Sequence, residues 1–336
     1  MSTTKQPDAK VGTTEEVRRM YEKYPYPSPT VGESYIRDLA NAVAFIFPET
    51  DFAGQSILDG GCGTGHRLVG LAKQYPKANV TGVDMTQASL EVAAAMAVRH
   101  GATNMRVVRD NLLDLRIEEK FDLITTTGVL HHLEDPQTGL NNLCARLKDN
   151  GVILIWLYHS IGEFERLLQR EAAWILGSQD KGDFTDRVEV MRELGLRLSS
   201  ERYGTNTSRQ SHSDVDRVSI DVDAFIHPIV RGYRFDEVIA ILKAAGMDWT
   251  CVNGVNTEGA SLLIDLGGCA EDPTFCLSEE KLLKTDNLIK RYRALSPLDK
   301  LRVIEITAKP TGFTILAGRG ESYRACDPRI QGGVLI

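Results

Sequence analysis

A glycine-rich turn after a short apolar strand is the part of this sequence best suited to hold a ligand. It reads Asp59-Gly60-Gly61-Cys62-Gly63-Thr64-Gly65, and the strand covers residues 56–59. Glycine permits a tight turn and leaves main-chain atoms open to a ligand, because it has no Cβ. Open α/β sheets bind ligands at the carboxyl ends of their strands. The turn therefore predicts a nucleotide-type site lined by Gly61, Gly63 and Gly65.

The spacing of these glycines and the acid before them narrow the kind of ligand. Dinucleotide sites use the pattern G-x-G-x-x-G and hold a pyrophosphate at a helix N-terminus. Here the spacing is G-x-G-x-G, and His66 stands where the third glycine would be. Asp59 would repel a pyrophosphate but suits a ligand that carries a sulfonium and an ammonium group. The pattern favours S-adenosylmethionine over NAD, and a plain tight turn is the alternative.

Two more acids follow the next strands at positions that suit a nucleoside. Asp84 ends a predicted strand over residues 80–84, roughly 20 residues after the glycines, where an acid accepts hydrogen bonds from ribose hydroxyls. Asp110-Asn111 follows a predicted strand over residues 105–108, where a carboxylate can take the exocyclic amine of an adenine. The alternatives are a helix cap for Asp84 and a turn for Asp110-Asn111.

Alternating strands and helices must position these residues. Continuous apolar strands separated by amphipathic helices indicate a parallel sheet covered on both faces, which is a doubly wound α/β fold. We therefore predict a mainly parallel, seven-stranded, Rossmann-like sheet. The strands are expected over residues 56–59, 80–84, 105–108, 121–125, 152–158, near 249–252 and over 312–317, and the main helices over residues 36–47, 66–74, 89–100, 140–147, 235–245 and 281–293.

The segments around this pattern give a domain organisation. The first helix should begin with a capping box between Thr13 and Glu16 and end near Tyr24, before a run of prolines. Residues 161–232 break the α/β rhythm after the fifth strand and include a polar, charged stretch. The expected units are a disordered tail plus helical lid (1–34), a cofactor-binding core (35–160), an inserted helical substrate cap (161–232), the completion of the core (233–320) and a C-terminal tail (321–336).

Together these motifs resemble the class I S-adenosylmethionine-dependent methyltransferases over roughly residues 35–160. The resemblance rests on residues 57–65, on Gly82-Val83-Asp84, and on Phe121-Asp122-Leu123-Ile124 followed by Gly128-Val129-Leu130-His131-His132-Leu133; Gly60 stands where Val or Ile is more usual. It implies S-adenosylmethionine as cofactor, with its methionine part against Asp59, Gly61, Gly63 and Gly65, its ribose on Asp84 and its adenine on Asp110. Met85, Asn111 and Gly128 complete the expected cofactor site.

More loosely, the flanks resemble a bacterial group of these enzymes with an N-terminal Tyr-x-x-x-Pro-Tyr-Pro signature. Here the signature is Tyr21-Glu22-Lys23-Tyr24-Pro25-Tyr26-Pro27, and the match extends to Asp223-Ala224-Phe225-Ile226-His227-Pro228 and through Tyr233 to Gly312-Phe313-Thr314. That group shares no single substrate, so the resemblance adds to the fold rather than to the chemistry.

The acceptor side of the site is less defined. Methyl transfer is an in-line attack that depends on positioning, and a base is needed only when the acceptor must lose a proton. His131, His132, Tyr158 and His227 are the candidate catalytic residues, with structural hydrogen bonding as the alternative. No metal is expected, because no other His, Cys or acid is spaced to help the His131-His132 pair. Tyr21, Tyr24 and Tyr26 could form a lid or simply dock the first helix, and Arg231 and Tyr233 could reach the acceptor or lie in a solvated loop.

Composition limits the partners. The net charge of −7 over 336 residues leaves no basic stripe, so nucleic acid is not expected as a partner. The six cysteines form no C-x-x-C pair, and no signal peptide or 18-residue apolar stretch is present, which predicts a cytoplasmic protein with reduced thiols and no membrane contact. A homodimer is the base-rate expectation. We predict methyl transfer to a small molecule; the alternatives are a protein, peptide or RNA methyltransferase and a non-catalytic or NAD-type nucleotide-binding protein.

Overall fold

The fold is built around one mixed sheet. The computed structural model describes residues 12–28, 34–178, 180, 184–198, 214–257, 260–266 and 275–336. Within them eight strands pair in the order β3-β2-β1-β4-β5-β8-β6-β7. The strands are β1 (Ser56–Gly60), β2 (Asn79–Asp84), β3 (Met105–Arg109), β4 (Phe121–Thr127), β5 (Leu147–Tyr158), β6 (Trp249–Thr257), β7 (Ala260–Leu263) and β8 (Gly312–Gly318).

The α/β prediction is confirmed, but the count of seven strands is wrong. β1 to β5 pair in parallel, whereas β8 is antiparallel to both of its neighbours, β5 and β6. The additional strand is β7, which runs antiparallel to β6 at the edge of the sheet. β7 has only four residues, half-buried or exposed, and is shorter than the strands that the sequence pattern revealed.

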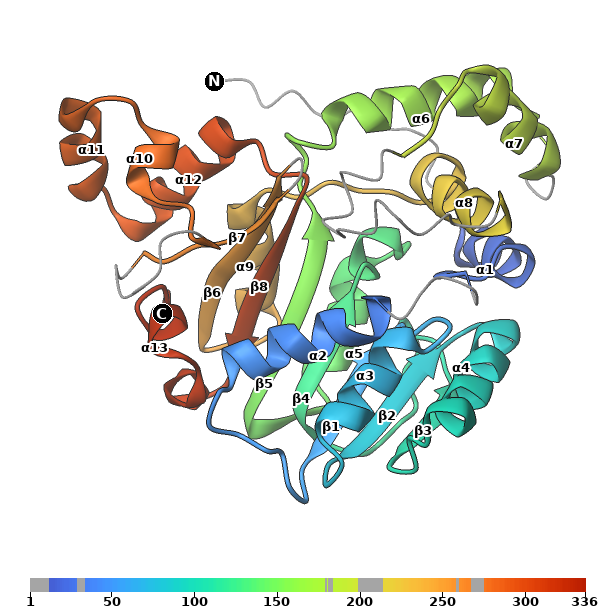
Figure 1. Cartoon of the computed structure of the whole chain (residues 1–336), viewed down its shortest axis with the longest axis horizontal. Coiled ribbons are helices and arrows are strands. Elements are labelled where there is room, and N and C mark those ends of the chain that lie inside the picture. The colour runs from blue at the N-terminus through green and yellow to red at the C-terminus, as the bar shows by residue number, and fades with distance from the viewer. Residues whose placement is uncertain are drawn as a thin grey trace.

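Helices cover both faces of the sheet, as parallel strands require (Figure 1). On one face the side chains of α2, α3 and α4 share a core with β1 and β2. On the other face α5, α9 and α12 pack on β4, β5 and β8. The helices of the two layers are α2 (Ser34–Ile46), α3 (His66–Gln74), α4 (Gln87–His100), α5 (Pro136–Cys144), α9 (Phe235–Ala244) and α12 (Pro297–Ala308), with a 3-10 turn η1 (Leu130–His132) after β4.

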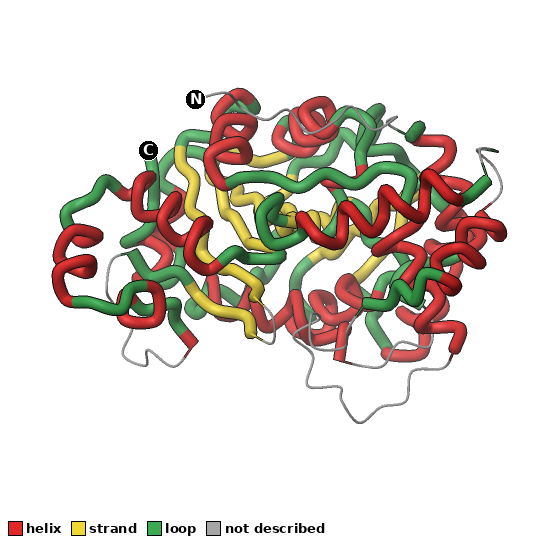
Figure 2. The backbone as a smooth tube through the Cα atoms, turned by 90° about the horizontal axis from the view of Figure 1, so that it is seen from above, coloured by secondary structure: helices red, strands yellow, loops and turns green. Residues whose placement is uncertain are grey.

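The inserted segment forms a second, smaller core together with the first helix. Helix α1 (Thr14–Lys23) has the predicted capping box, in which Glu16 N donates to Thr13 and the Glu16 carboxylate accepts from Thr13 N. Met20 of α1 is fully buried among side chains of the insertion. The cap contains α6 (Phe164–Leu176), α7 (Phe184–Glu193), α8 (Asp214–Asp221) and a π-helical turn η3 (Val222–Ile226). Figure 1 shows α1 beside α8 of this cap, and Figure 2 shows the strands enclosed between helices.

The C-terminal region differs in detail from its prediction. In place of one helix over residues 281–293, two helices divide the segment, and the second of them has Thr285 as its N-cap. A third helix begins at Pro297, beyond Ser296. Residues 321–336 pack on the core: Ile330 is buried, and Leu335 forms a β-bridge with Thr250. The elements are α10 (Glu279–Leu282), α11 (Asp286–Arg293), α12, η5 (Ser322–Ala325) and α13 (Pro328–Gln331).

Three general expectations concern the whole chain. The segment predicted to be a disordered tail lies, up to residue 11, outside the described residues. Cys62, Cys144, Cys251, Cys276 and Cys326 are buried free thiols, and the sixth cysteine lies outside the described part. Among the helices that are described, none has both the length and the apolar character needed to cross a bilayer.

Candidate active site

The glycine turn lies where the strand order reverses, between β1 and the start of α3. Gly61, Gly63 and Gly65 have φ values of 80°, 52° and 79°, a backbone region that favours glycine. A Cβ on Gly61 would lie 2.5 Å from a methyl carbon of Val129, and one on Gly63 would lie 2.4 Å from the carbonyl oxygen of Tyr26. The glycines are therefore needed both for the turn and for the close approach of two other loops.

Asp84 ties the turn to the end of β2. One oxygen of its carboxylate accepts from Gly63 N at 2.9 Å, and the other accepts from the main-chain N–H and the hydroxyl of Thr86 at 2.9 and 2.7 Å. Helix α4 begins after Thr86, so Asp84 is not its N-cap. Burial raises the pKa of Asp84 despite these hydrogen bonds. The carboxylate faces the cavity and retains acceptor capacity for a ligand.

Asp59 and Asp110 face the same cavity from two other strands. Asp59 accepts from the hydroxyl of Thr125 at 2.8 Å, and burial raises its pKa to about 6. Asp110 accepts from the main-chain N–H groups of Asn111 and Arg116, so it also holds the loop after β3. A buried carboxylate with few partners gains from a cation or a hydrogen-bond donor. Asp59 is such a group, and the half-buried Asp84 and Asp110 add two further carboxylates along the cavity. Together the three fit a ligand with an ammonium or sulfonium group, sugar hydroxyls and an amine.

One cavity of about 980 Å³ connects these acids with the acceptor candidates. This volume lies near the upper end of the range for ligand pockets, which is roughly 300–1,000 Å³. Most of the predicted residues line it. They are Asp59, Gly61, Gly63, Asp84, Met85, Asp110, Asn111 and Gly128 on the cofactor side, and Tyr21, Tyr26, His132 and Tyr158 on the acceptor side.

The remaining predicted residues lie behind the cavity wall or away from it. His131 is fully buried, stacks on Tyr158 with ring centroids 4.0 Å apart, and accepts from Tyr158 N. Arg231 donates from its main chain to the carbonyl of His131 and from its side chain to that of Glu134. Gly65 lies against Ala93, which occupies the space that a Cβ would need, and Tyr24 packs in the core of the cap. Tyr233 pairs through its main chain with Tyr158 and His159, and His227 stacks on His132.

The N-terminal segment closes one side of the cavity. Tyr26 and Pro27 lie on the glycine turn, where the carbonyl of Pro27 accepts from the hydroxyl of Thr64 at 2.8 Å. Tyr21, on α1, donates from its hydroxyl to Asp223 of the cap at 2.7 Å. The segment thus covers the site and also docks α1 on the cap, so the two interpretations of the tyrosines are compatible.

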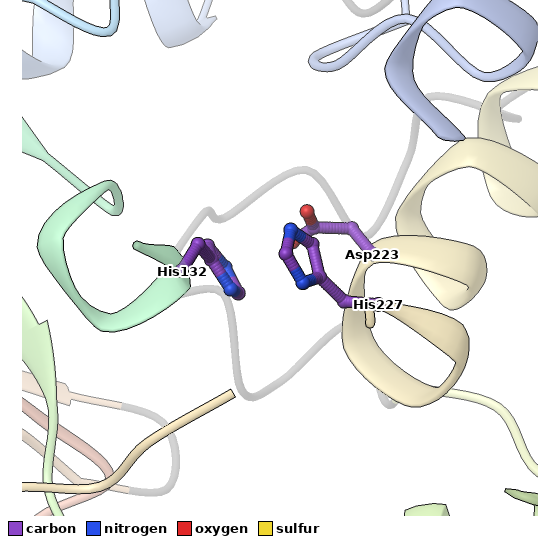
Figure 3. Close-up of side chains that lie close together, drawn as sticks. All are labelled: His132, Asp223 and His227. Atoms are coloured by element: carbon purple, nitrogen blue, oxygen red, sulfur yellow. The ribbon is translucent and has the colours of Figure 1, made fainter. Parts of the chain in front are cut away.

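His132, Asp223 and His227 form the most concentrated group of ligand-type side chains (Figure 3). Their nitrogen and carboxylate oxygen atoms lie within 4.8 Å of one another, and all three are buried. The expectation that no further acid or histidine stands near the His131-His132 pair is therefore wrong. Asp223 and His227 are about 90 positions away in the chain, and only the docking of the cap brings them close.

The geometry of this group does not suit a metal ion. The rings of His132 and His227 are stacked, with centroids 3.7 Å apart and planes 24° apart, so their lone pairs run side by side instead of converging. His227 Nδ1 accepts from Ile229 N at 3.0 Å, which places the ring proton on Nε2. His132 Nδ1 donates to the carbonyl of Ile229 at 2.7 Å, which leaves its Nε2 as a free acceptor. The described atoms thus favour two stacked histidines, held by the main chain of Ile229, rather than a metal site.

Sequence reasoning missed three charged residues beside this cluster. Glu163 and Arg166 are buried and form an ion pair one helical turn apart at the start of α6. Arg166 also lies over the ring of Tyr158, 4.5 Å from its centroid. In the sequence, Asp223 stood out only as the first residue of the segment Asp223–Pro228, which resembles the bacterial group. A spacing of three between Glu and Arg is common on solvated helices, so the sequence carried no signal that this pair lines a cavity.

A further wall of the cavity was also unexpected. It extends over β6, β7 and β8, where Asn253, Asn256, Ser261 and Thr314 offer amides and hydroxyls. Asn256 is fixed there by a hydrogen bond from Trp156 Nε1 at 2.7 Å. The cavity is therefore longer than a site for the cofactor alone would require.

Comparison with known proteins agrees with this geometry. Residues 51–187 match a family model described as a methyltransferase domain. Over 317 residues the chain is 29% identical to the uncharacterized protein syc1184_c of Synechococcus sp., which covers 91% of this chain and 72% of that protein. It is 33% identical over 126 residues to a ubiquinone biosynthesis O-methyltransferase of Haemophilus ducreyi, over 35% of this chain and 52% of the relative. The chain spans about half the length of the named methyltransferases that it matches.

Solved structures agree on the fold. PKMT2 from Rickettsia typhi superposes with a TM-score of 0.57 at 15% identity, over 86% of this chain and 53% of that one. A second structure of PKMT2, in complex with AdoHcy, gives a TM-score of 0.54 at 18% identity, over 85% and 54%. AdoHcy is what S-adenosylmethionine becomes when it loses its methyl group. Residues 51–187 of the chain thus match a methyltransferase domain, and S-adenosylmethionine is the cofactor of this domain.

Proposed function

We propose that this protein transfers the methyl group of S-adenosylmethionine to a small-molecule acceptor by in-line attack. The observation that carries the proposal is one cavity, which joins the carboxylates of Asp59, Asp84 and Asp110 to a second end walled by His132, Tyr158 and the cap. When bound, S-adenosylmethionine supplies an electrophilic methyl group on a positively charged sulfur. The protein then has to bind, orient and enclose the acceptor.

The proposed cofactor contacts follow from which atoms face the cavity. Asp59, with one oxygen held by Thr125, is placed to attract the positively charged methionine end. Asp84 is placed to accept from ribose hydroxyls, and Asp110 and Asn111 from the adenine amine. Gly61, Gly63, Met85 and Gly128 supply the main-chain and apolar walls between them.

The acceptor end supports a small molecule more than a protein or a nucleic acid. It lies beneath α1 and the cap, and Tyr26 is held against the glycine turn by the Thr64–Pro27 hydrogen bond. A buried end that is closed over by the protein excludes water, which strengthens the electrostatic interactions within it. Relatives that are named for small or carrier-bound acceptors, among them trans-aconitate 2-methyltransferase, agree with such an acceptor.

The domain organisation is proposed on the same grounds. The described parts of residues 35–160 and 233–320 build the sheet and its helices, while α1 and the described part of residues 161–232 share a separate core over the cavity. This cap with its helical lid is the part that we assign to acceptor recognition. The placement of the protein in the cytoplasm and its assembly as a homodimer remain predictions from the sequence.

The experiment that tests the function is a metabolite screen for the release of S-adenosylhomocysteine. Purified protein and S-adenosylmethionine are incubated with pooled small metabolites, and with peptide and RNA pools in parallel. Release that depends on a small metabolite supports the proposal. Release only with the peptide or RNA pool would replace the acceptor class and leave methyl transfer intact.

A further inference from the structure

Asp223 has an environment that the methyl-transfer function alone does not explain. It lies on the π-helical turn η3, is 5% exposed, and faces the acceptor end of the cavity. π-helical turns of this kind are frequent at functional sites. Within the described residues, its carboxylate has one hydrogen bond, from the hydroxyl of Tyr21 at 2.7 Å. A buried carboxylate with one partner is costly to keep, unless a ligand uses it.

The positive charges near Asp223 are engaged elsewhere. Arg166 pairs with Glu163 and donates to the carbonyl of Ala224. Arg170 donates to the carbonyls of His227 and Pro228 at 2.6–3.1 Å. Neither arginine forms a salt bridge with Asp223 in the described part of the structure. Glu163 and Arg166 offset each other, and Arg170 is held on two carbonyls, so Asp223 is a carboxylate of the acceptor end without a salt-bridge partner among the described residues.

The phenols around Asp223 are hydrogen-bond donors at neutral pH. Burial raises the pKa of Tyr21, Tyr26 and Tyr158, and the charge of Asp223 raises each pKa further. With Tyr35 and Trp156 these rings wall the cavity. A flat ring that carries a hydrogen-bond donor or a positive charge fits walls of this kind, whereas a carboxylate would meet the charge of Asp223.

Asp223 is a better proton acceptor than the histidine beside it. Burial lowers the pKa of His132 to about 3, whereas burial raises the pKa of Asp223 to about 6. A general base works best when its pKa lies near the working pH. The free Nε2 of His132 is therefore suited to orient an acceptor by a hydrogen bond, and the carboxylate of Asp223 is suited to take the proton.

We propose that Asp223 is the catalytic proton acceptor of this enzyme and that its methyl acceptor is a hydroxyl or amine compound, not a carboxylate. The inference rests on the proposed methyl-transfer function and narrows its substrate class. The lone pair of the acceptor's oxygen or nitrogen forms the bond to the methyl carbon, the methyl–sulfur bond breaks, and its electron pair stays on the sulfur. The proton of the acceptor moves to the carboxylate of Asp223 and leaves to water after product release.

A binding experiment tests the charge preference without a known substrate. Protein saturated with S-adenosylhomocysteine is titrated in a calorimeter at pH 7.5 with tyramine, which carries a phenol and an amine, and with phenylacetate, a carboxylate. We expect tyramine to bind at least about tenfold more tightly, which corresponds to about 1.4 kcal/mol. Asp223→Asn should bring the two affinities together, whereas Asp149→Asn, an exposed aspartate at the far end of β5, should not.

Equal affinity of the two probes in the wild type, including no measurable binding of either, would overturn the charge preference. So would an unchanged preference in Asp223→Asn. Failure of S-adenosylhomocysteine itself to bind would instead overturn the proposed function, so the two failures are distinguishable. Stoichiometric binding of Zn²⁺ that is lost in His132→Ala would also overturn the inference, because the cluster would then be a metal site.

The proton transfer is tested by turnover of the acceptors that the metabolite screen and a panel of phenols, amines and carboxylates reveal. Asp223→Asn should lower kcat about 10²- to 10⁴-fold and leave the affinity for S-adenosylhomocysteine unchanged. Wild-type kcat should fall as the pH drops below about 6. His132 and His227 face Asp223 but titrate below this range, because burial lowers their pKa values. Asp59, at the cofactor end of the cavity, has a pKa of about 6 as well, so the comparison with Asp223→Asn assigns the acidic limb. Turnover confined to carboxylates, or full kcat in Asp223→Asn, would contradict the proposal.

Discussion

Replacing Asp223 by asparagine is expected to stabilise the fold at neutral pH while it removes the proton acceptor. The ordinary pKa of an aspartate is 3.8, and burial raises that of Asp223 to about 6 in the folded protein. At 1.36 kcal/mol for each pKa unit, the folded state is disfavoured by about 3 kcal/mol once the carboxylate is ionised. Asparagine has no charge to desolvate, and its Oδ1 can still accept from Tyr21.

The sign of the effect fixes its pH dependence. A carboxyl group whose pKa is raised by folding is favourable to the fold below its ordinary pKa, and this contribution is lost as the pH rises through about 6. The free energy of unfolding of Asp223→Asn should therefore equal that of the wild type near pH 3.8. The free energy of unfolding of the variant should exceed that of the wild type by about 1.5 kcal/mol at pH 5 and by about 3 kcal/mol at pH 7.5.

Urea unfolding at a series of pH values between 4 and 8 measures this difference, with Asp149→Asn as the matched control on an exposed aspartate. The expected gain at pH 7.5 corresponds to a rise in Tm of about 5 °C in a chain of this size. A variant that is less stable than the wild type at pH 7.5, or one whose gain does not change with pH, would refute the view that Asp223 is a buried, underpartnered carboxylate.

Three further variants test other parts of the site. Tyr21→Phe removes the hydrogen bond that lowers the pKa of Asp223. The pH below which kcat falls should therefore rise by about one unit. An unchanged pH profile would show that Tyr21 does not influence the proton acceptor. Gly63→Ala would place a Cβ 2.4 Å from the carbonyl oxygen of Tyr26 and should weaken S-adenosylhomocysteine binding, measured by calorimetry, at least about tenfold. The control Gly101→Ala also has a positive φ, but its Cβ would meet no atom within 4 Å, and it should leave this binding unchanged. Glu305→Ala should lower the free energy of unfolding by about 3–5 kcal/mol, because its buried carboxylate accepts from His159, Arg234 and Phe235 N. Since Glu305 does not line the cavity, an altered cofactor affinity in that variant would contradict the assignment.

Local chemistry explains which parts of the fold were predictable. The glycine turn, the acid at the end of β2 and the capping box of α1 depend on residues close in the sequence, and their types fix the backbone. Continuous apolar strands made the core of the sheet recognisable. β7 has four residues and lies at the edge of the sheet, so its apolar run was too short to be recognised as a strand.

The acceptor end of the site could not be predicted in the same way. His132 and Asp223 meet because the cap packs against α1 through Met20 and its neighbours, and this packing is not written in any short motif. The burial that shifts the pKa of Asp223 is a property of that packing as well. His131, which sequence reasoning treated on equal terms with His132, points away from the cavity because Tyr158 covers its ring.

The most direct test of the account is calorimetric titration of the full chain with S-adenosylhomocysteine and, separately, with NAD. The account predicts one binding site for S-adenosylhomocysteine, an affinity that falls in Asp84→Ala while the fold is retained, and no heat with NAD. Heat with NAD and none with S-adenosylhomocysteine would contradict the assignment of the glycine turn and of the three carboxylates around it.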